Sequence, residues 1–85
     1  MATDYEFVVM PGATKPSYVF FTQGKAYISR YSGYDVLKDG EYCLGLNTDK
    51  WFIRNKSIGN NWEHIPATEV PDDIKGAAFL VKLQY

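Results

Sequence analysis

The sequence has only one cysteine and one histidine among its 85 residues. A single cysteine excludes an internal disulfide, and with it the small secreted scaffolds that depend on cystines. Cys43 alternates with Leu44 in a strand-like run, so we interpret it as a buried, small apolar residue. No motif links it to His64, and a nucleophilic thiol needs a nearby base.

Longer signatures are missing too. No stretch approaches the length of a membrane span, and the start, MATDYEFVV, lacks the basic region and long apolar run of a signal peptide. We therefore expect a cytoplasmic protein. There is no phosphate-binding glycine loop, no nucleophile elbow and no metal-ligand spacing. Glu63 and His64 form one candidate acid–base pair, but a histidine packed under a loop explains them better. The sequence predicts no enzymatic activity, catalytic residue, metal or cofactor.

The chain also lacks an excess of either charge, because nine basic and ten acidic residues give a formal net charge of −1. A charge this close to zero favours neither a nucleic-acid binder nor an acidic mimic of nucleic acid. Aromatic residues, in contrast, make up 16% of the chain. Since aromatic residues favour strands and can build a small core, we place most of them in the core rather than on a binding surface.

The strongest local signal is Asp39-Gly40, which stands between the β-prone runs VLK and EYCL. Asp-Gly in this setting predicts a hairpin with a type I′ turn, which needs positive φ at both central residues. In that hairpin Lys38 lies opposite Glu41, a favourable cross-strand pair.

The remaining segments are read as further short strands of a single domain, residues 1–85. β-prone runs and turn signals indicate strands at 5–10, 17–22, 25–30 and 50–54, and residues 62–65 form either one brief strand or a single turn. Residues 67–75 predict at most one short helical turn. For residues 77–83 we favour a strand over a helix. The predicted fold is all-β, a small curved antiparallel sheet or a partly open barrel.

Basic and aromatic residues interleave from residue 25 to residue 56, which leaves three interpretations open. Tyr, Trp and Arg are enriched at protein–protein hot spots, whereas rings between cations also bind single-stranded nucleic acid. The third interpretation has rings in the core and charges on a solvated rim. The residues assigned to a protein-binding surface are Tyr31, Tyr34, Trp51, Arg54 and Trp62. Those assigned to the nucleic-acid alternative are Lys25, Tyr27, Arg30, Lys50 and Lys56.

Residues 21–66 contain a T-x-G-K-x-Y opening (Thr22 to Tyr27), a D-G turn and a W-x-x-I-P segment (Trp62 to Pro66). In this combination they resemble small SH3-like β-barrel proteins that bacteriophages often encode. The resemblance implies a partly open antiparallel barrel without enzymatic activity that binds a host or phage macromolecule. The KDGE turn is less acidic than in such domains, and the N-terminal strands and the AAFLVKLQY tail are additional. No functional residue is transferred from it.

The leading functional prediction is a non-enzymatic module that binds another protein, as a phage-encoded modulator or inhibitor of a host factor in the host cytoplasm. The first alternative is binding of single-stranded RNA or DNA. The second is a structural homo-oligomer that forms through exposed strand edges, at residues 5–10 or 79–83.

Overall fold

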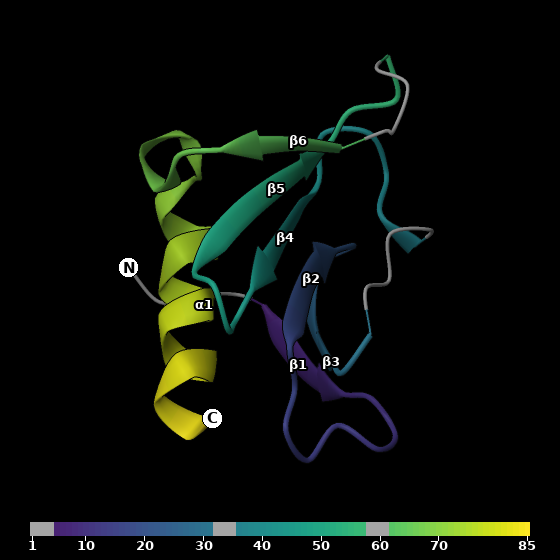
Figure 1. Ribbon diagram of the computed structural model, residues 1–85, viewed down its shortest axis with the longest axis vertical. Coiled ribbons are helices and arrows are strands. Elements are labelled where there is room, and N and C mark those ends of the chain that lie inside the picture. Colours follow the sequence, from purple (N-terminus) through teal and green to yellow (C-terminus); the bar gives the residue numbers. More distant parts are fainter. Residues whose placement is uncertain (1–4, 32–35, 58–61) are drawn as a thin grey trace.

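In the part of the chain that the structure describes, six short strands form one open sheet, and one α-helix packs against one of its faces (Figure 1). The computed structural model describes residues 5–31, 36–57 and 62–85. The strands are β1 (Glu6–Val9), β2 (Tyr18–Thr22), β3 (Lys25–Ser29), β4 (Tyr42–Gly45), β5 (Lys50–Arg54) and β6 (Trp62–Ile65). The 3-10 helix η2 (Ala67–Glu69) and the α-helix α1 (Asp72–Gln84) follow. The fold is small and rich in sheet, as predicted, but it is not all-β.

The strand order is β1-β3-β2-β4-β5-β6, so β1 and β6 lie at the two edges of the sheet. Four of the five strand pairs are antiparallel, but β1 pairs with β3 in parallel, so the sheet is mixed and not purely antiparallel. The tight two-residue hairpin joins β2 to β3. Its central residues Gln23 and Gly24 have φ of 54° and 75°, and a type I′ turn requires positive φ at both positions.

The predicted hairpin around Asp39-Gly40 is wrong, although the turn itself is present. The Glu41 N–H donates to the Lys38 carbonyl at 3.0 Å, and Gly40 has a φ of 88°. Asp39 is not among the residues with positive φ, so the turn is not type I′. Residues 36–38 cannot pair with β4 because β2 and β5 already occupy both of its edges.

Residues 72–84 form a helix, so the strand predicted at 77–83 is wrong. The prediction relied on alternate apolar residues near the C-terminus. The buried residues of α1 are Ile74, Ala77, Ala78 and Val81, which is the i, i+3, i+4, i+7 spacing of a helix face. Asp72 and Asp73 in the first turn interact favourably with the helix dipole. No helix in the described part of the chain is long and apolar enough to cross a membrane.

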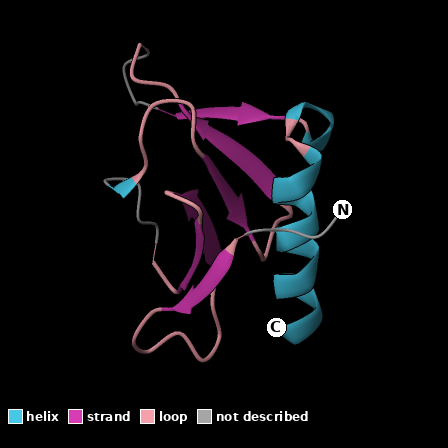
Figure 2. Cartoon of the chain, turned by 180° about the vertical axis from the view of Figure 1, so that it is seen from behind, coloured by secondary structure: helices cyan, strands magenta, loops and turns pink. Residues whose placement is uncertain are grey.

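The two faces of the sheet are covered unequally. The larger core lies between the sheet and α1, where Val19, Phe21 and Trp51 meet the buried helix residues. Figure 2, seen from behind, shows α1 on one side of the sheet. The smaller core lies on the opposite face, where Leu37 covers Phe20 and Cys43. Because α1 covers one face of the sheet, the opposite face is the one that remains accessible to a ligand.

Glu41 ties the turn at residues 38–41 to the β2–β3 hairpin. Its Oε1 accepts hydrogen bonds from the Lys38 N–H at 2.6 Å and from the Thr22 hydroxyl at 2.7 Å. Its Oε2 accepts one from the Gln23 N–H at 3.3 Å. Hydrogen bonds to a carboxylate are stronger than those between neutral groups, so this side chain anchors the segment that leads into β4.

We expect Glu41→Ala to lower the free energy of unfolding by about 1–3 kcal/mol, because three donors lose their acceptor at once. Chemical denaturation followed by tryptophan fluorescence measures this change. Glu69→Ala is the matched control, since Glu69 is exposed on η2 and its loss should change stability by less than about 0.5 kcal/mol. Equal losses in the two variants would contradict the anchoring role of Glu41.

Candidate functional site

The candidate site is the face of the sheet that points away from α1, which we call the open face. Residues alternate along each strand, so the neighbours of the helix-side core residues point the other way. The open-face side chains of the five strands β2 to β6 are Tyr18, Phe20, Thr22, Lys25, Tyr27, Ser29, Cys43, Lys50, Phe52, Arg54, Trp62 and His64. Six of these twelve residues carry an aromatic ring, counting the imidazole of His64. Half of the side chains on this face are therefore aromatic.

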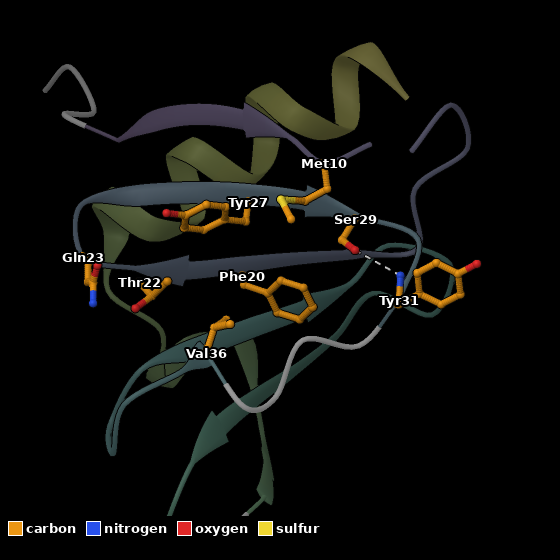
Figure 3. A pocket seen from close by; sticks show the side chains of 8 residues that line it. All are labelled: Met10, Phe20, Thr22, Gln23, Tyr27, Ser29, Tyr31 and Val36. Atoms are coloured by element: carbon orange, nitrogen blue, oxygen red, sulfur yellow. Dashed lines mark hydrogen bonds between the residues drawn. The ribbon is translucent and has the colours of Figure 1, made fainter. Parts of the chain in front are cut away.

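A cavity of about 400 Å³ lies over the β2–β3 part of the open face. It is lined by Met10, Phe20, Thr22, Gln23, Tyr27, Ser29, Tyr31 and Val36. Figure 3 shows the rings of Phe20 and Tyr27 along the cavity, with Gln23 and Thr22 toward one end and Tyr31 toward the other. Phe20 and Tyr27 are direct partners in the β2–β3 register, so the hairpin itself sets the cavity floor.

The rim of the cavity exposes large apolar side chains. Tyr31 is 70% exposed, and Val36 and Met10 are also exposed. The Tyr31 N–H donates to the Ser29 Oγ at 3.1 Å, which fixes the backbone as the chain leaves β3. Apolar side chains that surround a concave site in this way are typical of a binding site.

A second group of rings lies on the β5–β6 part of the open face. The Arg54 guanidinium lies 5.6 Å from the centroid of the Trp62 ring, within the range of a cation–π interaction. The Phe52 and His64 rings are 5.5 Å apart and tilted by 44°. Glu63 points to the other side and accepts a hydrogen bond from the Asn55 Nδ2 at 3.2 Å. The candidate Glu63–His64 acid–base pair is thus split between the two faces.

The residues predicted for a protein-binding surface do not form one patch. Tyr31 lies at the cavity rim, close to the end of β3. Arg54 on β5 and Trp62 on β6 lie together, and β2 and β4 separate these two strands from β3. Trp51 is only 6% exposed, because the alternation in β5 points it into the helix-side core, where its ring lies 5.8 Å from that of Phe21. A partner cannot reach it, so Trp51 drops out of the candidate site. Tyr34 lies outside the described residues.

The residues predicted for the nucleic-acid alternative are spread more widely. Lys25 and Tyr27 lie on the open face of β3, and the exposed Arg30 places its guanidinium 5.7 Å from the Tyr31 ring centroid. Lys50 is the first residue of β5 and Lys56 follows the end of this strand. Both are exposed, and the Lys56 N–H donates to the Asp39 Oδ1 at 2.9 Å. The cations therefore lie in two groups, one near β3 and one near β5.

Sequence reasoning missed most of the cavity, namely Met10, Phe20, Thr22, Gln23, Ser29 and Val36. A usable signal existed in the two-residue Gln23-Gly24 turn, because such a turn fixes the pairing of the strands on either side. That pairing places Phe20 opposite Tyr27. No local signal brings Met10 or Val36 to the same place, since both approach from distant segments.

The chemistry of the titratable groups is limited. Burial raises the pKa of the Cys43 thiol to about 12, so the group is protonated at neutral pH and is a poor nucleophile. Among the residues that the structure describes, no cluster of His, Cys, Asp or Glu could hold a metal ion. What the open face offers is aromatic rings, hydroxyl groups and the cations of Lys25 and Arg54.

The raised pKa of Cys43 predicts a loss of stability in alkali. Between its ordinary value of 9.0 and about 12, the unfolded chain releases the thiol proton while the native chain keeps it, so stability falls as pH rises. From about pH 7 to about pH 10.5 the cysteine should contribute a loss of about 2 kcal/mol. Cys43→Ala lacks this contribution, and denaturation of both proteins at the two pH values measures the difference. The same pH dependence in both would contradict the raised pKa.

No protein family, curated protein or solved structure matches the chain. Function is therefore inferred from the side chains of the open face and from the cavity that they form.

Proposed function

We propose that the chain is a non-enzymatic binding module that holds a protein partner on the open face of its sheet. The observation that carries this proposal is the cavity of about 400 Å³ with exposed apolar side chains at its rim. Burial of Tyr31, Met10 and Val36 against a partner would remove apolar surface from water, at about 25 cal/mol for each Å². A cavity of this size accommodates one large side chain of a partner.

The lining of the cavity favours an uncharged anchor. None of its eight described lining residues carries a charge, and the polar atoms that it offers belong to hydroxyl and amide side chains. A phosphate or carboxylate would lose its hydration there without gaining a cation. An aromatic or aliphatic side chain packed over the half-buried ring of Tyr27 and against the rim residues would gain ring contacts instead, while the exposed Gln23 amide remains available to the partner's backbone.

The relationship to SH3-like barrel proteins of bacteriophages remains a prediction. The role of a phage-encoded modulator or inhibitor of a host factor in the host cytoplasm also remains a prediction. The partner proposed here is defined only by its chemistry, as a protein that presents an uncharged apolar anchor.

The test is affinity capture of partners from a cell lysate, with Tyr31→Ala compared to the unmodified chain. Because Tyr31 is 70% exposed, its truncation should leave the fold intact while the loss of a hot-spot ring weakens binding by about 2 kcal/mol, roughly 30-fold. Leu83→Ala is the matched control, since Leu83 is 68% exposed but lies on α1, away from the open face.

A captured partner that survives nuclease treatment, is lost with Tyr31→Ala and is kept with Leu83→Ala supports the proposal. Equal capture by Tyr31→Ala and the unmodified chain contradicts it, and so does loss of the partner with Leu83→Ala alone.

Single-stranded nucleic acid is a second candidate, because Arg54 and Trp62 form a cation–π pair on the same face as Lys25. Bases stack on such rings while cations neutralise phosphates. If this candidate holds, an oligonucleotide quenches Trp62 fluorescence at low salt, and affinity falls with salt at a slope of about −0.7 per phosphate contacted. Trp51 is buried, so its fluorescence should not change when an oligonucleotide binds. Trp51→Phe removes this contribution and leaves the Trp62 signal alone, at some cost in stability. No quenching at low salt would remove this candidate.

A further inference from the structure

The strand β1 lies at the edge of the sheet and is well fixed there. It pairs with β3 along its whole length, from Glu6 opposite Lys25 to Val9 opposite Ile28. The preceding Tyr5 packs its ring edge-to-face against Phe21 at 5.5 Å, which ties the start of β1 to the helix-side core. Among the described residues, no strand pairs with the outer edge of β1.

The outer edge of β1 presents the backbone groups of two residues. The N–H groups of Glu6 and Met10 donate toward β3, to the carbonyls of Gly24 at 3.1 Å and Ile28 at 2.9 Å. Successive residues of a strand direct their backbone groups to opposite edges, so the N–H and C=O groups of Phe7 and Val9 point outward. These groups form a short template for another strand.

The side chains of the same two residues are exposed. Phe7 is 38% exposed and Val9 is 54% exposed, and both lie on the helix side of the sheet in register with the buried Ala26 and Ile28. The helix-side core thus continues outward at β1 as an uncovered apolar row. An exposed edge strand usually carries a charge, a proline or a bulge that prevents pairing. The charge in β1 is at its first residue, Glu6, and the segment Phe7-Val8-Val9 that would pair carries neither charge nor proline.

We propose that β1 pairs with the β1 strand of a second copy of this chain, in antiparallel orientation about a two-fold axis at Val8. In this register Phe7 lies opposite Val9 of the other copy, and Val8 lies opposite Val8. The outward backbone groups of Phe7 and Val9 then form the hydrogen-bonded pairs, and Val8 forms the close non-hydrogen-bonded pair, as an antiparallel ladder requires. The two sheets join into one.

Self-complementarity is the reason to choose a second copy as the occupant. The pairing places an aromatic residue opposite a β-branched residue twice, which is a favourable cross-strand combination. It places Glu6 opposite Met10, so no two like charges meet. A two-fold interface uses the same patch on both chains, and this strand matches itself in both hydrogen-bond pattern and side-chain type.

The test is the mass of the chain in solution as a function of concentration, by sedimentation equilibrium. The unmodified chain should move from 9.7 kDa toward twice that mass between micromolar and millimolar concentration. Val9→Lys should remain at 9.7 kDa, because the lysine charges the paired row. Val9→Pro should also remain a monomer, because proline removes the outward N–H of residue 9. The amides of Glu6 and Met10 still bond to β3 in this variant.

Leu83→Lys is the matched control, because Leu83 has a similar exposure on the outer surface of α1. It should dimerise like the unmodified chain. A monomer at every concentration overturns the proposal, and so does a dimer that survives Val9→Lys or that is lost only with Leu83→Lys. Since Val9 does not line the cavity, Val9→Lys should still capture a protein partner, so this proposal and the proposed function fail separately.

Hydrogen exchange of the unmodified chain keeps the test valid even if a variant does not fold. In the dimer the amides of Phe7 and Val9 should exchange at least about tenfold more slowly at high concentration than at low concentration. The amides of Glu6 and Met10, which already bond to β3, should change little. Equal exchange of the Phe7 and Val9 amides at all concentrations would overturn the proposal.

Discussion

The rest of the structure depends on the burial of β2 on both of its faces. Val19 and Phe21 point to the helix side, while Phe20 and Thr22 point to the open face, and all four are buried. Such a strand needs neighbours at both edges, because buried backbone N–H and C=O groups require hydrogen-bond partners. It also needs a cover on both faces, because its apolar side chains are more stable away from water. The β3 and β4 strands supply the edges, α1 covers one face fully, and Leu37 covers the other only in part.

The incomplete cover over the open face creates the candidate site. The Phe20–Tyr27 pair forms the floor of a cavity there, and the rim residues around it complete its lining. The neighbouring Arg54–Trp62 pair extends the aromatic surface toward β6. The Cys43 thiol beneath this region is buried and protonated at neutral pH.

Sequence patterns predicted the segments of the fold much better than their arrangement. All six strands fall within or close to segments predicted as strands, but β4 pairs with β2 and β5 and not with residues 36–38. The candidate site was predicted less well. Tyr31, Arg54 and Trp62 do lie at the open face, whereas Trp51 is buried, because a shift of one position along a strand moves a side chain to the opposite face.

The sequence by itself determined the local features, namely the turn residues, the short β-prone runs and the acidic start of the last segment. Each of these follows from the conformational preferences of a few neighbouring residues. Only the tertiary structure decided that 72–84 is a helix, that β1 joins β3 in parallel and that both edges of β4 are occupied. These choices depend on which distant residues can bury their apolar surface together, and a local pattern does not contain that information.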